Sequence, residues 1–392
     1  MHIDDMDEWR AWLLALRTPG LGPGGLRARL DAAGGDISGV LAQLRRDAVS
    51  LGEPARAWLA RPDQARLDAD MAWLAEPGHC LLRCTESDFP PQLENIPQPP
   101  AVLFVVGDAS LLLYPQVAIV GARAASAAGL VHARAFACSL AEAGFTITSG
   151  MADGIDGAAH GAVLDASAGT LAVIGTGPDR VYPRKHHALA RRLAAQGALV
   201  SEFPPGTAAR ADHFPRRNRI IAGLSLGTLV IEAGLRSGSL ITARLAAEQG
   251  REVFALPGSI HNPLARGCHR LIRDGARLVE TAAEIIETLA PAACMLGTEL
   301  AARLQQDPVE RVPSVTGERT GYSGISMASE PEYRRLLDEL GHDPATMDEL
   351  VQRTGVSPAI LSSMLLMLEL EARVESLPGN RYQQMPPHAA SR

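Results

Sequence analysis

The sequence is poor in lysine and in cysteine. Of its 37 basic residues only Lys185 is a lysine, which we attribute to the base composition of the gene rather than to function. The five cysteines are scattered, and the one close pair, Cys80 and Cys84, has CxxxC spacing with no second pair. This pattern excludes a zinc ribbon and a disulfide framework. We therefore expect a reduced, cytoplasmic protein.

Long apolar runs are also missing. No uninterrupted apolar stretch reaches the roughly 18 residues that span a bilayer, so no membrane association is expected. The N-terminal segment MHIDDMDEWR is acidic and lacks the basic and then apolar layout of a signal peptide. With 46% hydrophobic and 21% charged residues over 392 positions, the composition is that of a globular protein with two or three domains.

Motifs for nucleotide cofactors are absent as well. GxxxxGK[ST] does not occur, which excludes a P-loop NTPase. The glycine-rich segment 121–129, GARAASAAG, departs from GxGxxG because Arg123 replaces the second glycine, so NAD and FAD are not expected. The turn could still hold a single phosphate at a helix N-terminus, with Arg123 as a clamp, or Arg123 could form a structural ion pair.

Candidate catalytic and metal-binding residues are few. Asp156 and His160 lie four positions apart, as a metal pair would, but no third ligand follows from the spacing. We expect these two residues to hydrogen-bond to each other. No Ser/His/Asp or Cys/His arrangement is found. The sequence therefore predicts no catalytic residue, no metal and no cofactor.

Charge is distributed unevenly along the chain. The formal net charge is −7, yet residues 101–280 hold 18 Lys and Arg against 13 Asp and Glu, together with 7 of the 11 histidines. A basic middle inside an acidic chain favours a local anionic ligand. The alternative is a merely uneven surface charge.

The same middle region alternates short apolar strands with helical stretches. This alternation predicts a Rossmann-like parallel sheet with helices on both faces, and ligands at the carboxyl ends of its strands. The predicted strands are VAIVG, FTITSG, LAVIG, ALVSE, TLVIE, EVFALPG and ARLVE. The predicted domains are a helical N-terminal domain at 1–85, the Rossmann-like domain at 86–288, a linker at 289–329 and a winged-helix domain at 330–385.

Glycine and arginine recur where these strands end. The most basic segment is FPRRNRIIAGLS, which carries Arg216, Arg217 and Arg219. These arginines either pair with acids such as Glu202, Asp212 and Glu232, which two of the three could do, or face a phosphodiester. Because Arg123, Arg184 and Lys185 are expected at the same sheet edge, too few acids remain, and the polyanion is favoured.

The serine turn of SGSLITA suits a helix N-cap and a phosphate equally well. Residues 101–280 contain no tryptophan, so base stacking is not expected to dominate binding.

The segments VAIVGARAAS, ITSGMADGIDGAAH, VYPRKHH, FPRRNRIIAGLS and GLRSGSLITA resemble, in order, the DNA-processing protein A (DprA, also called Smf) family. The resemblance covers about residues 85–280. It implies a protein that binds and protects incoming single-stranded DNA and loads the RecA recombinase in natural transformation, without catalytic turnover. It also implies a homodimer formed near Leu271 and Ile272. The implied DNA-binding residues, with their motif neighbours, are Gly121, Arg123, Ser126, Gly150, Met151, Arg184, Lys185, His186, Arg216, Arg217, Asn218, Arg219, Ser237, Gly238 and Ser239.

The flanking regions are less basic. RTPGLGPGGLRARL resembles a helix-hairpin-helix turn, for which a purely structural role is the alternative. The helix expected to be the recognition helix of the winged-helix domain, SPAILSSMLLMLELEARV, is short of Arg and Lys. We therefore favour a protein-contact or domain-packing role over transcriptional regulation.

A nucleotide-binding hydrolase is the alternative function. GLSLGTLVIEAG resembles the PGGxGTxxE motif of the lysine-decarboxylase-like family but lacks its first glycines. Glu232 would then be the catalytic acid.

Overall fold

The protein has two compact parts, Met1–Pro308 and Val309–Arg392, which are considered separately. A computed structural model describes residues 3–306, 331–340, 345–354, 374–377 and 381–384, and the single residues 356, 361, 364, 365 and 368.

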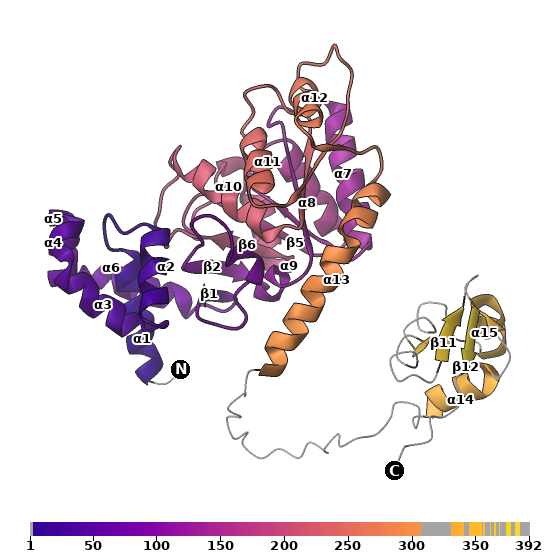
Figure 1. The fold of residues 1–392 in the computed structure, drawn as a ribbon, viewed down its shortest axis with the longest axis horizontal. Helices are drawn as coiled ribbons and strands as arrows, with labels where there is room; N and C mark the ends of the chain where they lie inside the picture. Colours follow the sequence, from indigo (N-terminus) through magenta and orange to yellow (C-terminus); the bar gives the residue numbers. More distant parts are fainter. Residues whose placement is uncertain are drawn as a thin grey trace. The chain divides into compact units, whose positions relative to one another are not determined.

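The first part is built around a nine-stranded sheet with the order β1-β2-β6-β5-β4-β3-β7-β8-β9 (Figure 1). From β3 to β9 the strands are parallel, and these seven are the strands predicted from the sequence. Their bounds are β3 Gln116–Gly121, β4 Thr146–Ser149, β5 Thr170–Val173, β6 Ala198–Ser201, β7 Gly227–Ile231, β8 Glu252–Ala255 and β9 Arg277–Leu278.

Two antiparallel strands extend this sheet beyond β6. The strand β1 (His79–Arg83) pairs with β2 (Val102–Gly107), which in turn pairs with β6. The predicted N-terminal domain, 1–85, includes β1. Leu81 packs in the apolar core of the N-terminal helices and Leu82 in that of the sheet, so this strand contributes to both cores.

Helices cover both faces of the sheet, as predicted. One face carries α7 (Ala127–Glu142), α8 (Ile155–Asp165) and α9 (His187–Gln196). The other carries α10 (His213–Leu224), α11 (Ser239–Glu248) and α12 (Arg266–Arg273). Because β4 to β6 follow β3 on one side and β7 to β9 lie on the other, the order reverses between β3 and β7. An open α/β sheet binds its ligands at such a switch point.

The N-terminal region is helical, with α1 Ile3–Leu16, α2 Pro23–Ala32, α3 Ile37–Arg46, α4 Ala48–Leu51, α5 Glu53–Ala60 and α6 Gln64–Leu74. It has its own apolar core around Trp12, which continues into Val102 and Phe104 of β2. The buried Arg17 pairs with Asp70 and donates to the carbonyl oxygen of Pro205 at 2.9 Å. These contacts fix the helical region against the sheet domain.

The helix α13 (Ala282–Gln306) runs through the first part of the predicted linker. Pro291 lies inside it, and packing of Ile285 and Leu289 against the sheet stabilises the helix. Arg303 holds its other end through Glu94 at 3.1 Å. Within the described residues, the stretch Ala282–Arg303 is long and apolar enough to cross a membrane by length and composition alone.

The second part contains α14 (Pro331–Leu340), α15 (Met347–Thr354) and a small sheet with the order β10-β12-β11. Its strands are β10 Ala345–Thr346, β11 Val374–Leu377 and β12 Arg381–Gln384. Apolar residues, including Leu336 and Leu350, form its core. Most of the expected recognition helix lies outside the described residues.

Candidate nucleic-acid interface

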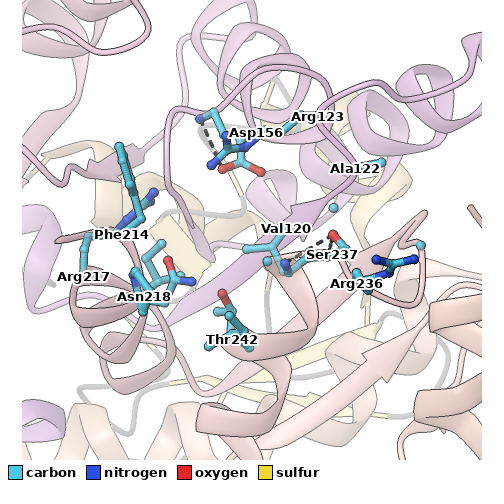
Figure 2. A pocket seen from close by; sticks show the side chains of 18 of the residues that line it. Val120, Ala122, Arg123, Asp156, Phe214, Arg217, Asn218, Arg236, Ser237 and Thr242 are labelled. Carbon is cyan, nitrogen blue, oxygen red and sulfur yellow. Dashed lines mark hydrogen bonds between the residues drawn. The ribbon is translucent and has the colours of Figure 1, made fainter. Parts of the chain in front are cut away.

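A cleft of about 800 Å³ opens at the switch point between β3 and β7. Figure 2 shows the side chains around it, with Arg123 on the turn after β3, Asn218 on α10 and Arg236 on the turn after β7. The cleft therefore gathers residues from three predicted strand-end motifs that lie far apart in the sequence. Gly121, at the end of β3, is part of its wall.

Arg123 is exposed and faces an aromatic pair. Its guanidinium carbon lies 5.9 Å from the ring centroid of Phe214, and that ring lies 5.3 Å from the ring of Tyr182. Among the described residues no carboxylate pairs with Arg123, so the structural ion pair considered from the sequence is not formed. The two aromatic rings were missed because neither is a tryptophan and they lie 32 positions apart.

Arg217 is buried beneath the cleft. It donates from Nη1 to the carbonyl oxygen of Val173 at 2.9 Å. A β-carbon on Gly150 would lie 1.7 Å from that nitrogen, so only glycine leaves room for this guanidinium. Burial lowers the pKa of Arg217 to about 10, and the side chain still carries its charge at neutral pH. Its Nε has no hydrogen-bond partner in the described part of the chain.

The other two arginines of the segment FPRRNRIIAGLS, Arg216 and Arg219, form ion pairs with the same acid. Arg216 donates from Nε to Glu202 at 2.9 Å, and Arg219 pairs with the second carboxylate oxygen of Glu202. Glu202 and Arg219 are both buried. Asn218, between them in the sequence, lines the cleft instead. The segment thus faces an acid through Arg216 and Arg219, and the cleft through Arg217 and Asn218.

The YPRKHH segment lies beside the loop that follows β4. Lys185 and His186 both approach Oδ1 of Asp153, at 3.0 and 3.1 Å. The ring of His186 also contacts the carbonyl oxygen of the buried Met151 at 3.0 Å. Arg184 is exposed and has no ion-pair partner among the described residues. Of these three basic side chains, Lys185 and His186 have an acidic partner among the described residues, and Arg184 does not.

A phosphate at the turn before α7 was one of the two possibilities considered from the sequence, and Glu232 occupies that position. The backbone N–H of Ser126 donates to Oε2 of Glu232 at 2.7 Å, and its hydroxyl donates to Oε1 at 2.5 Å. The hydroxyl also accepts from the N–H of Gly129 at 3.0 Å, which makes Ser126 the N-cap of α7.

The serine turn, Ser237 to Ser239, also lines the cleft. Ser237 and Ser239 share a hydroxyl–hydroxyl contact of 2.7 Å, and Gly238 is the N-cap residue of α11 without a side-chain cap. Arg236, just before them, is exposed and unpaired within the described residues. The N–H groups of Ser237, Leu240 and Ser239 donate within the turn at 2.9, 3.2 and 3.4 Å, so what this turn offers the cleft is the guanidinium of Arg236.

Asp156 and His160 do not form the pair that the sequence predicted. Asp156 accepts from the N–H groups of Gly150 and Ala152 at 3.1 and 3.3 Å, and its burial raises its pKa. His160 contacts the hydroxyl of Thr170 at 2.8 Å, and burial lowers its pKa to about 3. Each residue therefore fixes a different part of the backbone. No group of three or more potential metal ligands occurs among the described residues.

The sheet, the cleft at its switch point and the second part define a Rossmann-like α/β protein with a winged-helix domain. The chain belongs to the DNA processing protein A (DprA/Smf) family. Residues 80–290 match the family described as DNA recombination-mediator protein A, and residues 325–380 match the DprA winged helix domain.

Similar proteins come from distant bacteria. Protein Smf of Escherichia coli K12 is 42% identical over 314 residues, which is 80% of this chain and 79% of that protein. The crystal structure of DprA from Streptococcus pneumoniae superposes with a TM-score of 0.62 at 35% identity, over 73% of this chain and 98% of that one. DprA of Helicobacter pylori, whose single-stranded DNA binding mode has been described, gives a TM-score of 0.50 at 29% identity over 55% and 96%.

Proposed function

We propose that this protein binds single-stranded DNA in the cleft at the switch point. The observation that carries the proposal is the set of unpaired donors around one cavity: Arg123 and Arg236 lack an acidic partner, and Asn218 lacks a hydrogen-bond partner, all within the described residues. Cations without counter-charges are what a phosphodiester requires. The single-stranded DNA binding of the Helicobacter pylori relative supports this.

The aromatic pair modifies how the DNA would be held. Tyr182 is 44% exposed beside Phe214 at the cleft, and both rings are available to a base. Stacking on such rings tolerates any sequence, because every base has a π-face. We therefore expect binding that combines phosphate contacts with stacking and is not sequence-specific.

We further propose that the bound strand is protected and passed to RecA, in the cytoplasm, by a homodimer that carries out no catalytic turnover. A groove beside α11 and α12 supports a dimer, since the exposed Leu235 and Ile241 lie near Leu271 there. The hydrolase alternative needs Glu232 to reach a nucleotide, and both carboxylate oxygens of Glu232 already accept hydrogen bonds.

The test is fluorescence anisotropy with a labelled single strand of roughly 30 nucleotides and the matching duplex across a salt series. Wild type is compared with Arg123→Ala and Arg236→Ala, and with Arg134→Ala, an exposed arginine further along α7, as the control. Each cleft variant should weaken single-strand binding and reduce the salt slope by about 0.7. Cleft variants that bind like the control would show that the DNA lies elsewhere.

A further inference from the structure

Glu232 occupies a special position in this fold. It follows β7 directly, at the switch point, and its backbone has a φ of +53°, a left-handed conformation that is uncommon outside glycine. Its side chain crosses to the N-terminus of α7, where Oε2 accepts from the N–H of Ser126 and Oε1 from its hydroxyl. Asn262 donates to Oε1 from a third segment at 3.3 Å.

The surroundings fit a carboxylate closely. A β-carbon on Gly129 would lie 2.5 Å from Oε2, so this glycine lets the carboxylate reach the first turn of α7. Three features hold the Glu232 carboxylate in this one position. They are the strained backbone of Glu232, the three hydrogen bonds to its carboxylate and the lack of a side chain at position 129. A side chain that merely pointed to solvent would need none of them.

This placement coincides with the phosphate position of nucleotide-binding α/β proteins. There, the turn after the first strand of the parallel sheet and the N-terminus of the following helix bind the phosphate of a nucleotide through backbone N–H groups. In this chain β3 is that strand and α7 that helix. The N–H of Ser126 and the adjoining space are already taken by a negatively charged group of the protein itself.

We propose that Glu232 is an internal anion that keeps free nucleotides from binding at the N-terminus of α7, next to Arg123 and Ala124 of the cleft wall, and so favours a polynucleotide in the cleft. Nucleoside phosphates are abundant competitors of any cleft that binds DNA phosphates. A carboxylate in the mononucleotide position both fills the space and repels a second anion at short range. The DNA strand then gains its contacts from Arg123 and Arg236, which line the cleft, and Ser126 serves Glu232 rather than DNA. The proposal rests on the proposed function, because selectivity matters only if the cleft binds DNA.

The experiment measures binding of deoxyadenosine 5′-monophosphate and of deoxyadenosine by isothermal titration calorimetry. Glu232→Gly removes the carboxylate, and glycine adopts the left-handed φ without strain. This variant should bind the monophosphate about tenfold more tightly than wild type, with no gain for the nucleoside, since the gain comes from the phosphate. Glu248→Gln, which changes an exposed glutamate on α11 paired with Arg244 at 2.9 Å, should behave as wild type.

Glu232→Gln is the second variant, because it preserves the size of the side chain and removes only the charge. It should gain about threefold for the monophosphate through loss of repulsion, and it decides the question if the glycine variant does not fold. Variants that melt cooperatively yet gain nothing would overturn the proposal. So would wild-type protein that already binds the monophosphate as tightly as Glu232→Gly, or an equal gain for deoxyadenosine. No DNA is present in this assay, so a failure to bind single strands would count against the proposed function alone.

Discussion

Gly150 leaves room for the side chain of Arg217, because a β-carbon at position 150 would lie 1.7 Å from Nη1 of the guanidinium. The two residues come from different motifs, one after β4 and one in α10. This close approach places the buried charge of Arg217 beneath the cleft, and its buried Nε has no hydrogen-bond partner among the described residues.

Gly150→Ala should therefore destabilise the protein by about 1–3 kcal/mol, because the methyl group and the guanidinium cannot share this space. Urea unfolding followed by circular dichroism measures the change. The control is Gly161→Ala on α8, where a β-carbon meets nothing within 4 Å and a small stabilisation of about 0.5–1 kcal/mol is expected. Equal stabilities for the two variants would show that Arg217 moves aside freely.

Glu202 should be a structural residue rather than a DNA contact. Glu202→Ala leaves the buried Arg219 without its acid and should cost about 3–5 kcal/mol in the free energy of unfolding. Arg216→Ala should cost at most about 1 kcal/mol, since the side chain of Arg216 is 38% exposed. Denaturant titration of both variants gives the comparison. A loss for Arg216→Ala as large as that for Glu202→Ala would contradict this account.

Arg184 and Lys185 are neighbours with different expected effects on DNA binding. Arg184→Ala should weaken single-strand affinity and lower the salt slope by about 0.7, because its charge is free to neutralise a phosphate. Lys185→Ala should have the smaller effect, because Lys185 already pairs with Asp153 at 3.0 Å. Anisotropy titrations at several salt concentrations measure both slopes, with Arg134→Ala as the control. A larger effect from Lys185→Ala would reverse the assignment.

The parallel sheet was predictable because each of its strands is a short apolar run that ends in glycine or a polar residue. The strands β1 and β2 were not, since they are antiparallel and no helix connects them. The sequence also did not predict that α13 continues past Pro291. Packing of Leu289 on the sheet stabilises the helix there despite the proline.

The candidate site was predictable in place but not in detail. Strand-end arginines indicated the edge of the sheet at which the cleft lies. The sequence offered Glu202 as a possible partner but could not decide between an acid and a phosphodiester, because the pairing of Arg216 and Arg219 with Glu202 joins residues 14 and 17 positions apart through tertiary packing. It also could not say that Glu232 would fill the N-terminus of α7, since the partner, Ser126, lies 106 positions away.

His160 should make the stability of the protein depend on pH. The hydroxyl of Thr170 donates to the carbonyl oxygen of Ile147 at 2.7 Å, so it accepts from Nδ1–H of His160. The buried Nε2 has no hydrogen-bond partner in the part of the chain that the structure describes. Protonation of Nε2 would bury a charge, which is why burial lowers the pKa of His160 from 6.5 to about 3. Below pH 6.5 the unfolded state therefore binds a proton that the folded state does not.

Stability should fall as the pH is lowered from 6.5 toward 3, by up to about 1.4 kcal/mol per pH unit from this residue. His160→Asn keeps an amide donor for Thr170 and removes the titration, so its stability should vary less with pH. Urea unfolding of both proteins over this range isolates His160, because the raised pKa of Asp156 acts in the opposite direction and is present in both. His132→Asn, at an exposed position on α7, is the control and should follow wild type. If the curves of wild type and His160→Asn run parallel, the buried ring is not held neutral in the folded state.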